Sequence, residues 1–228
     1  LALEGGGGRP SVALLEHAGL TPLPPYILSA RRSQGLEIDD EADRASYQTV
    51  VADPERTGSV AAPTAGLHFT PRLLEALAGR GVERAAVELQ VGAGTFKPVE
   101  TETLEAHPMH AEACAMDERA LRQVFERAAR VVAVGSTSAR TIESYASILE
   151  RGERPPERLE TDLLIAPGYT WKRVDALMTN FHLPRSTLLA MVSALFPEGM
   201  DRLRGIYAEA IERRYRFYSY GDAMLVLP

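Results

Sequence analysis

The stretch "TNFHLPRST", residues 179–187, places a hydroxyl, an amide, an imidazole and a guanidinium directly ahead of an apolar run. Ser186 or Thr187 can cap the helix predicted from that run, because short hydroxyl side chains satisfy free N–H groups at helix starts. Capping needs only some of these polar side chains, so we predict that the others form one wall of a ligand site. The side chains left for that task are Thr179, Asn180, His182 and Arg185.

Two further loops combine polar groups with strand ends in the same way. "GSTSART", residues 135–141, follows the β-branched run "VVAV" and leads into a predicted helix. Such a turn can hold a carboxylate or phosphate at a helix N-terminus. Plain N-capping by the hydroxyls is the alternative, and residue types alone favour it. The loop "GAGTF", residues 92–96, lacks the third glycine of a dinucleotide fingerprint and predicts only a tight turn.

Three histidines lie in irregular segments. "HPMHAE" sets His107 and His110 three residues apart with Glu112 nearby, which suggests a metal site. Pro108 spoils a regular helical pair and no further cysteine or histidine cluster follows, so a general base or a hydrogen-bonding role is favoured over a metal ligand. "APTAGLHFT" can present His68 to a ligand, with a histidine that only stabilises its own turn as the alternative.

The C-terminal stretch "ERRYRFYSYGDAM", residues 212–224, mixes arginines with aromatic side chains. This composition suits stacking on bases and contact with phosphate. A strand with core aromatics and solvated arginines explains the same pattern equally well, and spacing does not separate the two interpretations.

Composition limits the functions that the chain can have. It has 228 residues, 45% of them hydrophobic, and a formal charge of -6, which argues against binding nucleic acid by bulk electrostatics but permits a local basic face. The single Cys114 excludes an intramolecular disulfide and fits the reducing cytoplasm. With no apolar run of about 18 residues, a membrane-spanning protein is not expected.

The remaining pattern predicts the elements that position these groups. Strand candidates at residues 82–91, 131–135, 161–168 and 173–181 alternate with helices, and residues 216–227 close the series as a strand. Such alternation predicts an α/β fold with a mostly parallel sheet and crossover helices. Residues 1–46 are the least regular, and "LPPY" predicts an extended connector. We therefore expect a domain edge there, with residues 28–228 as the α/β catalytic domain.

Taken in order, the segments resemble one family closely. They are "PLPPYI", "YQTVVADPERTGSVAAPTAGLHFT", "VGAGTFKPVE", "HPMHAE", "VGSTSARTIES", "IAPGY", "VDALMTNFHLPRSTLLAMVSA" and "YRFYSYGDAM", from Pro22 to Met224. This ordered set is similar to the S-adenosylmethionine:tRNA ribosyltransferase-isomerases of queuosine biosynthesis. The resemblance implies a second, β-barrel lobe, of which residues 1–27 would be the tail and connector, with the family's more N-terminal sequence lacking here.

The resemblance also implies the reaction. The ribosyl group of S-adenosylmethionine, a co-substrate, would be transferred and isomerised onto the aminomethyl-deazaguanine base of a tRNA anticodon, giving epoxyqueuosine-tRNA, adenine and methionine. A sulfonium acidifies the ribose 5′ protons, so the reaction needs a general base, a proton donor for adenine and a clamp for methionine, but no metal. A cytoplasmic monomer that binds tRNA and no membrane is the expected form.

Roles for single residues follow from their motif and their chemical type. His68 and His110 are the first candidates for proton transfer, with His182 third. The candidates for S-adenosylmethionine are Tyr47, Gln48, Thr49, Thr95, Phe96, Ser136, Thr137, Arg140, Thr179 and Asn180. Those for tRNA are Arg185, Arg216 and Tyr220.

Two positions depart from the family pattern. Gln90 stands where a histidine is usual, and Ala93 where a larger aliphatic residue is common. If that histidine is catalytic in relatives, this chain lacks it. The alternatives to the tRNA-modifying enzyme are therefore a paralogue with the same sulfonium chemistry on another acceptor, and an inactive module that binds S-adenosylmethionine or tRNA.

Overall fold

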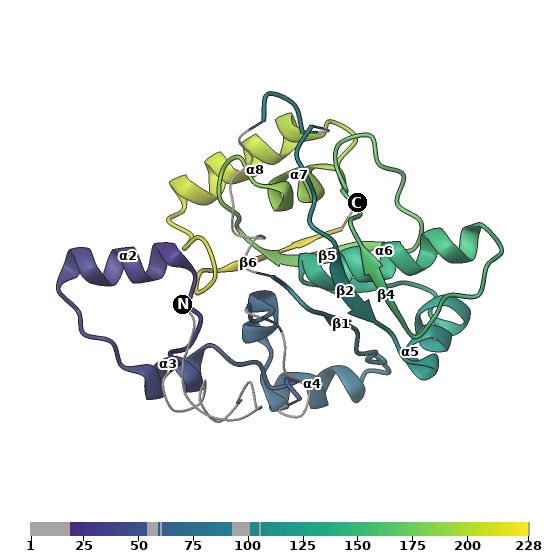
Figure 1. Ribbon diagram of the computed structural model, residues 1–228, viewed down its shortest axis with the longest axis horizontal. Helices are drawn as coiled ribbons and strands as arrows, with labels where there is room; N and C mark the ends of the chain where they lie inside the picture. Colours follow the sequence, from purple (N-terminus) through teal and green to yellow (C-terminus); the bar gives the residue numbers. More distant parts are fainter. Residues whose placement is uncertain (1–18, 54–58, 60, 93–100, 105, 228) are drawn as a thin grey trace, which may run out of the picture. The chain divides into compact units, whose positions relative to one another are not determined.

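The computed structural model describes residues 19–53, 59, 61–92, 101–104 and 106–227 (Figure 1). Chain contacts divide it into two compact units, of which the first ends at Gln48 and the second runs from Thr49. The domain edge predicted after residue 27 falls inside a helix of the first unit, residues 25–34. The expected barrel tail lies mostly outside the described residues and stays a prediction.

In the described part of the first unit, two helices form where the sequence predicted irregular chain. α2 (Pro25–Gln34) begins with proline at its first position, and α3 (Asp40–Ser46) is capped by Asp39, whose side chain accepts from the Ala42 N–H at 3.0 Å. The extended connector predicted at "LPPY" is therefore wrong from Pro25 onward. A proline at the first helical position sacrifices no hydrogen bond, so it can start a helix as well as prevent one.

The described residues of the second unit form two three-stranded sheets. In the first, β2 (Glu112–Ala115) pairs antiparallel with both β1 (Glu88–Leu89) and β4 (Arg158–Thr161). In the second, β5 (Ala176–Asn180) pairs parallel with β3 (Val132–Val134) and antiparallel with β6 (Ala223–Val226). The fold is mixed α/β, as predicted.

The mostly parallel sheet is not what the described residues form, because one of their four strand pairings is parallel. The strand–helix–strand rule holds only for β3, the following helix and β5. β4 lies between that helix and β5 in sequence but joins the other sheet, beside a strand, β2, that the sequence did not predict. The predicted strand at 216–227 begins only at Ala223.

Helix starts follow local chemistry closely. α4 (Pro71–Ala78) is capped by Thr70, which accepts from the Leu73 N–H at 3.2 Å, and Gly81 closes the turn after it at φ 78°. A threonine directly before a proline and a glycine beyond the last turn are typical of the two ends of a helix. The other helices in the described residues of this unit are the 3-10 turn η1 (Thr64–His68), α5 (Glu118–Arg122), the π-helical turn η3 (Gln123–Arg127), α6 (Ser136–Glu150), α7 (Thr187–Ser193) and α8 (Met200–Glu212).

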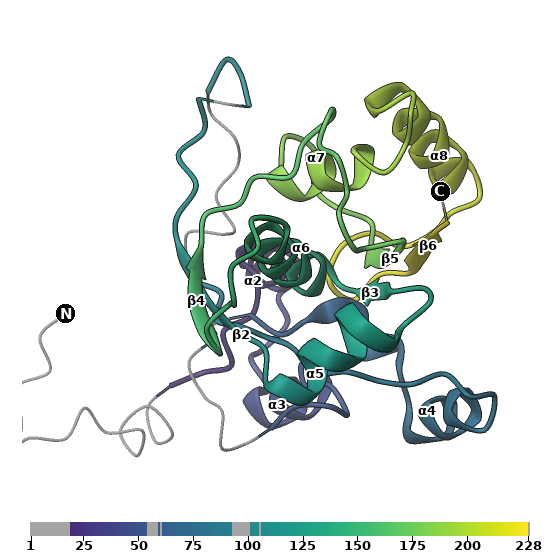
Figure 2. The ribbon, with the colours of Figure 1, turned by 90° about the vertical axis from the view of Figure 1, so that its right-hand side faces the viewer.

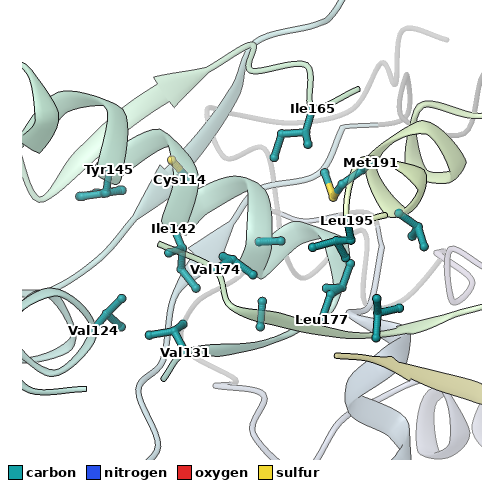
Figure 3. Close-up of a cluster of buried hydrophobic side chains, with 14 of the residues drawn as sticks. Cys114, Val124, Val131, Ile142, Tyr145, Ile165, Val174, Leu177, Met191 and Leu195 are labelled. Carbon is teal, nitrogen blue, oxygen red and sulfur yellow. The ribbon is translucent and has the colours of Figure 1, made fainter. Parts of the chain in front are cut away.

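α6 lies between the two sheets and organises the core (Figure 2). Its Ile142 and Tyr145 belong to a buried cluster with Leu177 of β5 and Met191 of α7 (Figure 3). The Tyr145 hydroxyl donates to the Glu157 carbonyl at 2.6 Å, so this fully buried polar group is satisfied. The packing fixes α6 against β3 and β5, and thereby fixes where its first turn lies.

Candidate active site

The turn η1 joins three of the segments that the sequence singled out. Its first three residues each approach a different part of the second unit: the end of β5, the turn between β3 and α6, and the first residue of the unit. All three lie at or near the carboxyl edge of the parallel pair β3–β5, the place where open α/β sheets bind ligands. The pairs are Thr64 with Asn180, Ala65 with Gly135, and Gly66 with Thr49.

Asn180 is the last residue of β5, and the oxygen of its side-chain amide is hydrogen-bonded whereas the nitrogen has no partner among the described residues. Its Oδ1 accepts from the Thr64 hydroxyl at 2.9 Å, which fixes the orientation of the amide plane. The side chain is 4% exposed, and Nδ2 finds no acceptor in the part of the chain that the structure describes. An unsatisfied buried donor costs on the order of 1–3 kcal/mol, so such an atom marks a place where a ligand acceptor can bind.

The contact of Gly66 with Thr49 is close enough to restrict both residues. A Cβ on Gly66 would lie 3.1 Å from Thr49 Cγ2, which is tighter than ordinary side-chain contact. Thr49 is buried, and its Oγ1 has no hydrogen-bond partner among the described residues. A second unused polar atom therefore lies against η1.

α6 starts without the capping that residue types favoured. Gly135 adopts φ 92° and its N–H donates to the Met178 carbonyl at 2.8 Å, which ties the turn to β5. No side-chain hydrogen bond caps the helix, so the prediction of hydroxyl N-capping is wrong here. Ser136 is buried and Thr137 is half-buried. The positive end of a 15-residue helix is left available for an acceptor or an anion.

Thr179 and His182 form a separate polar pair. Thr179 Oγ1 and His182 Nε2 are 2.8 Å apart, and the His182 N–H donates to the Tyr207 hydroxyl at 2.8 Å. Burial lowers the pKa of His182 to about 4, so its imidazole is neutral near pH 7. Successive strand residues point to opposite faces, so Thr179 shares the face of buried Leu177 and Asn180 the other.

Arg140 is held inside the protein by Glu112. Its Nη2 forms an ion pair with Glu112 Oε2 and donates to the Thr161 carbonyl at 3.4 Å, while Glu112 Oε1 accepts from the Gly92 N–H at 3.2 Å. The charge predicted to bind a ligand carboxylate is thus already paired with a buried one. The pair instead links α6 to the start of the glycine loop, whose predicted ligand residues Thr95 and Phe96 lie outside the described residues.

His68 ends η1 near the loop that precedes β6. That loop is closed by Arg216, whose backbone N–H and Nη2 donate to the Asp222 carboxylate at 2.7 and 2.9 Å. These Arg216 bonds lower the pKa of Asp222, and the charge of nearby His68 lowers it further. His68 is half-buried, so it remains accessible at the end of the η1 cluster.

Aromatic side chains of the C-terminal stretch divide between core and surface. Phe217 packs on Phe181 with ring centroids 4.8 Å apart, and Tyr207 packs against both rings. The core interpretation therefore holds for Phe217. Tyr220 is 39% exposed, as a base-stacking residue must be.

The other predicted residues are outside η1 and its three partners, or belong to the first unit. His110 is exposed two residues before β2, and Arg185 is exposed with φ 57°. Tyr47 and Gln48 end the first unit and directly precede Thr49 in sequence. Within the described ranges, no group of three or more His, Cys, Asp or Glu side chains could hold a metal ion, and no helix is long and apolar enough to span a bilayer.

Sequence reasoning missed the two residues that connect this cluster, Thr64 and Asp222. The signal for Thr64 is the "PTAGLH" stretch, where a glycine with no strand or helix pattern around it indicates close backbone approach. For Asp222 it is the "YGD" turn, since glycine next to aspartate marks a reversal of the chain.

Comparison with known proteins identifies the family. The model of a family described as queuosine biosynthesis protein matches residues 4–226. A protein of Novosphingobium aromaticivorans named S-adenosylmethionine:tRNA ribosyltransferase-isomerase is 52% identical, over 97% of this chain and 62% of its own length. One of the same name from Mesorhizobium japonicum is 52% identical over 93% and 56%. The chain thus spans about three fifths of these relatives.

A solved structure agrees with these relatives. The crystal structure of S-adenosylmethionine tRNA ribosyltransferase from Thermotoga maritima superposes with a TM-score of 0.54 and 44% identity, and the match covers 72% of this chain and 51% of that one. The segments that meet at η1 are among those that suggested the resemblance from sequence. The chain belongs to the family of queuosine biosynthesis proteins.

Proposed function

We propose that the chain carries the reaction for which its relatives are named, transfer and isomerisation of the ribosyl group of S-adenosylmethionine onto tRNA. The observation that carries the proposal is the η1 cluster. It gathers Thr49, His68, the start of α6 and Asn180, all from family-type segments, around buried polar atoms that have no protein partner among the described residues. S-adenosylmethionine fits such a site because it offers a carboxylate, ribose hydroxyls and ring nitrogens as acceptors.

Proton transfer in this scheme falls first to His68. It lies at the accessible end of η1, with Asp222 close enough to interact with its charge. It would remove a proton from the ribose 5′ carbon, whose acidity the adjacent sulfonium supplies. His110 is the second candidate and would donate to the departing adenine. His182 is the third candidate, because its lowered pKa makes it a weak proton acceptor and its Nε2 is already hydrogen-bonded to Thr179, so it suits orientation better than proton abstraction.

The acceptor in this proposal is the aminomethyl-deazaguanine base of a tRNA anticodon. Arg185, Arg216 and Tyr220 are exposed and would contact the RNA, although Arg216 also closes its own loop through Asp222. A monomer working in the cytoplasm, where tRNA is modified, belongs to the same proposal. The amine of the base would attack as methionine leaves, and closure of the epoxide would complete the product.

The test is incubation with S-adenosylmethionine and an anticodon stem-loop that bears the deazaguanine, followed by mass spectrometry of the RNA and assay of free adenine. Modified RNA together with adenine is the expected result. Adenine without modified RNA would indicate a paralogue with another acceptor, and binding without adenine would indicate an inactive module. Full turnover by a His68→Ala variant would remove His68 from the role of base, and full turnover by His110→Ala would remove His110 from the role of proton donor.

A further inference from the structure

We infer that the amide of Asn180, together with the first turn of α6, binds the carboxylate of the methionine moiety, and that the same site therefore retains free methionine as a product. This inference rests on the proposed function for the identity of the ligand. The geometry supplies the class of ligand group: an anion with two or more acceptor oxygens.

The donor character of the site is set by one hydrogen bond. An asparagine amide can present either its oxygen or its NH₂ group to a ligand, and Thr64 decides between them by donating to Oδ1 at 2.9 Å. Nδ2 is then turned away from Thr64 and carries two N–H groups with no acceptor among the described residues. A ligand oxygen is the partner that such a group requires.

The first turn of α6 supplies the positive end of a helix dipole beside this donor. Ala65 follows Thr64 in η1 and lies 3.9 Å from where a Cβ on Gly135 would be, so the amide and the helix start are held by adjacent residues. In the parallel register Val134, the last residue of β3, pairs with Met178, so the turn that opens α6 follows at the edge of the sheet where β5 ends in Asn180. An uncapped helix start and an NH₂ donor together favour a carboxylate over a neutral acceptor.

Arg140 leaves this role to the amide. Its guanidinium is paired with buried Glu112, so the site has no free cation in the described part of α6. Because the donors are N–H groups without a full positive charge, the ligand needs its carboxylate to bind, and the affinity is expected to be moderate. Release of methionine then depends on a few charge-assisted hydrogen bonds.

The experiment is calorimetric titration of the full chain with L-methionine and with L-methioninol, which replaces the carboxylate by a hydroxymethyl group. Wild-type protein is expected to bind methionine about tenfold or more tightly than methioninol. Asn180→Asp keeps the oxygen that Thr64 binds but replaces the donor with a like charge, so it is expected to lose this preference while it still binds methioninol. Equal binding of both ligands by wild-type protein, or an unchanged preference in Asn180→Asp, would overturn the inference.

Thr64 gives a second, independent variant. Thr64→Val removes the hydroxyl that orients the amide and is expected to reduce the methionine preference, whereas Thr64→Ser keeps the hydroxyl and is expected to restore it. Circular dichroism establishes that each variant is folded. A protein that binds methionine with this preference but modifies no tRNA would retain the inference and reject the proposed function; one that modifies tRNA with no preference would do the reverse.

Discussion

The half-buried imidazole of His182 predicts a pH dependence of stability that one substitution should remove. The ordinary histidine pKa is about 6.5, and burial lowers that of His182 to about 4 in the folded protein. Between these values the unfolded chain binds more protons than the folded one. The free energy of unfolding therefore falls as pH decreases through this window and is fully retained above the unfolded pKa.

The magnitude follows from the two pKa values. Between about pH 7.5 and about pH 5, a shift of this size removes about 2 kcal/mol from the free energy of unfolding, with less if the partial exposure of the side chain screens it. His182→Gln keeps a polar side chain next to Thr179 but does not titrate. Urea unfolding of both proteins at both pH values isolates the contribution, because all other titrating groups are common to them.

We expect the wild-type protein to lose about 2 kcal/mol more than His182→Gln over this pH range. An NMR titration of the His182 ring proton measures the folded pKa directly. Identical pH dependence in the two proteins, or a ring that titrates near the ordinary histidine value, would show that the site is wetter than its burial indicates. The assignment of His182 as a neutral hydrogen-bonding residue would then be refuted.

Two substitutions test the supports of the site, each with a matched control and each measured by urea unfolding. Glu112→Gln leaves the buried guanidinium of Arg140 without a counter-charge and is expected to lower the free energy of unfolding by about 3–5 kcal/mol. Its control, Glu118→Gln in an exposed ion pair, is expected to lower it by less than about 1 kcal/mol. Equal losses would contradict the buried pairing. Gly221→Ala puts a Cβ onto backbone carbonyls of its own loop and should cost about 2 kcal/mol, while Gly205→Ala, with open space around it in α8, should be neutral or stabilising.

Features with local causes could be predicted from the sequence. Ser186 caps α7 as predicted, and Thr70 and Asp117 cap α4 and α5 in the same way, because a cap needs only the residues three positions ahead. β5 also forms close to its predicted place, because a short apolar run of this length is typical of a buried strand. Helix starts and buried strands are thus determined within short windows.

Features that depend on partners distant in sequence could not be predicted. β2 has only four residues, and its strand character comes from pairing with β1 and β4 rather than from an alternating pattern. The contact of Thr64 with Asn180 spans 116 residues and leaves no mark in either local sequence beyond the motif itself. Resemblance placed both segments in one family pattern, and only the fold could bring them into contact.

The alternation of side chains along β5 gives neighbouring residues of the site different partners. Thr179 and Asn180 are neighbours in sequence, yet the strand sends one toward His182 and the other toward Thr64. The hydrogen bond from the Gly135 N–H to the Met178 carbonyl fixes this register at the start of α6. A slip by one residue would exchange the two side chains, so that a hydroxyl would replace the amide opposite Thr64 and the amide would face the imidazole. The polar cluster at "TNFH" therefore works as two sites with different partners, and the strand that separates them is as necessary as the residues themselves.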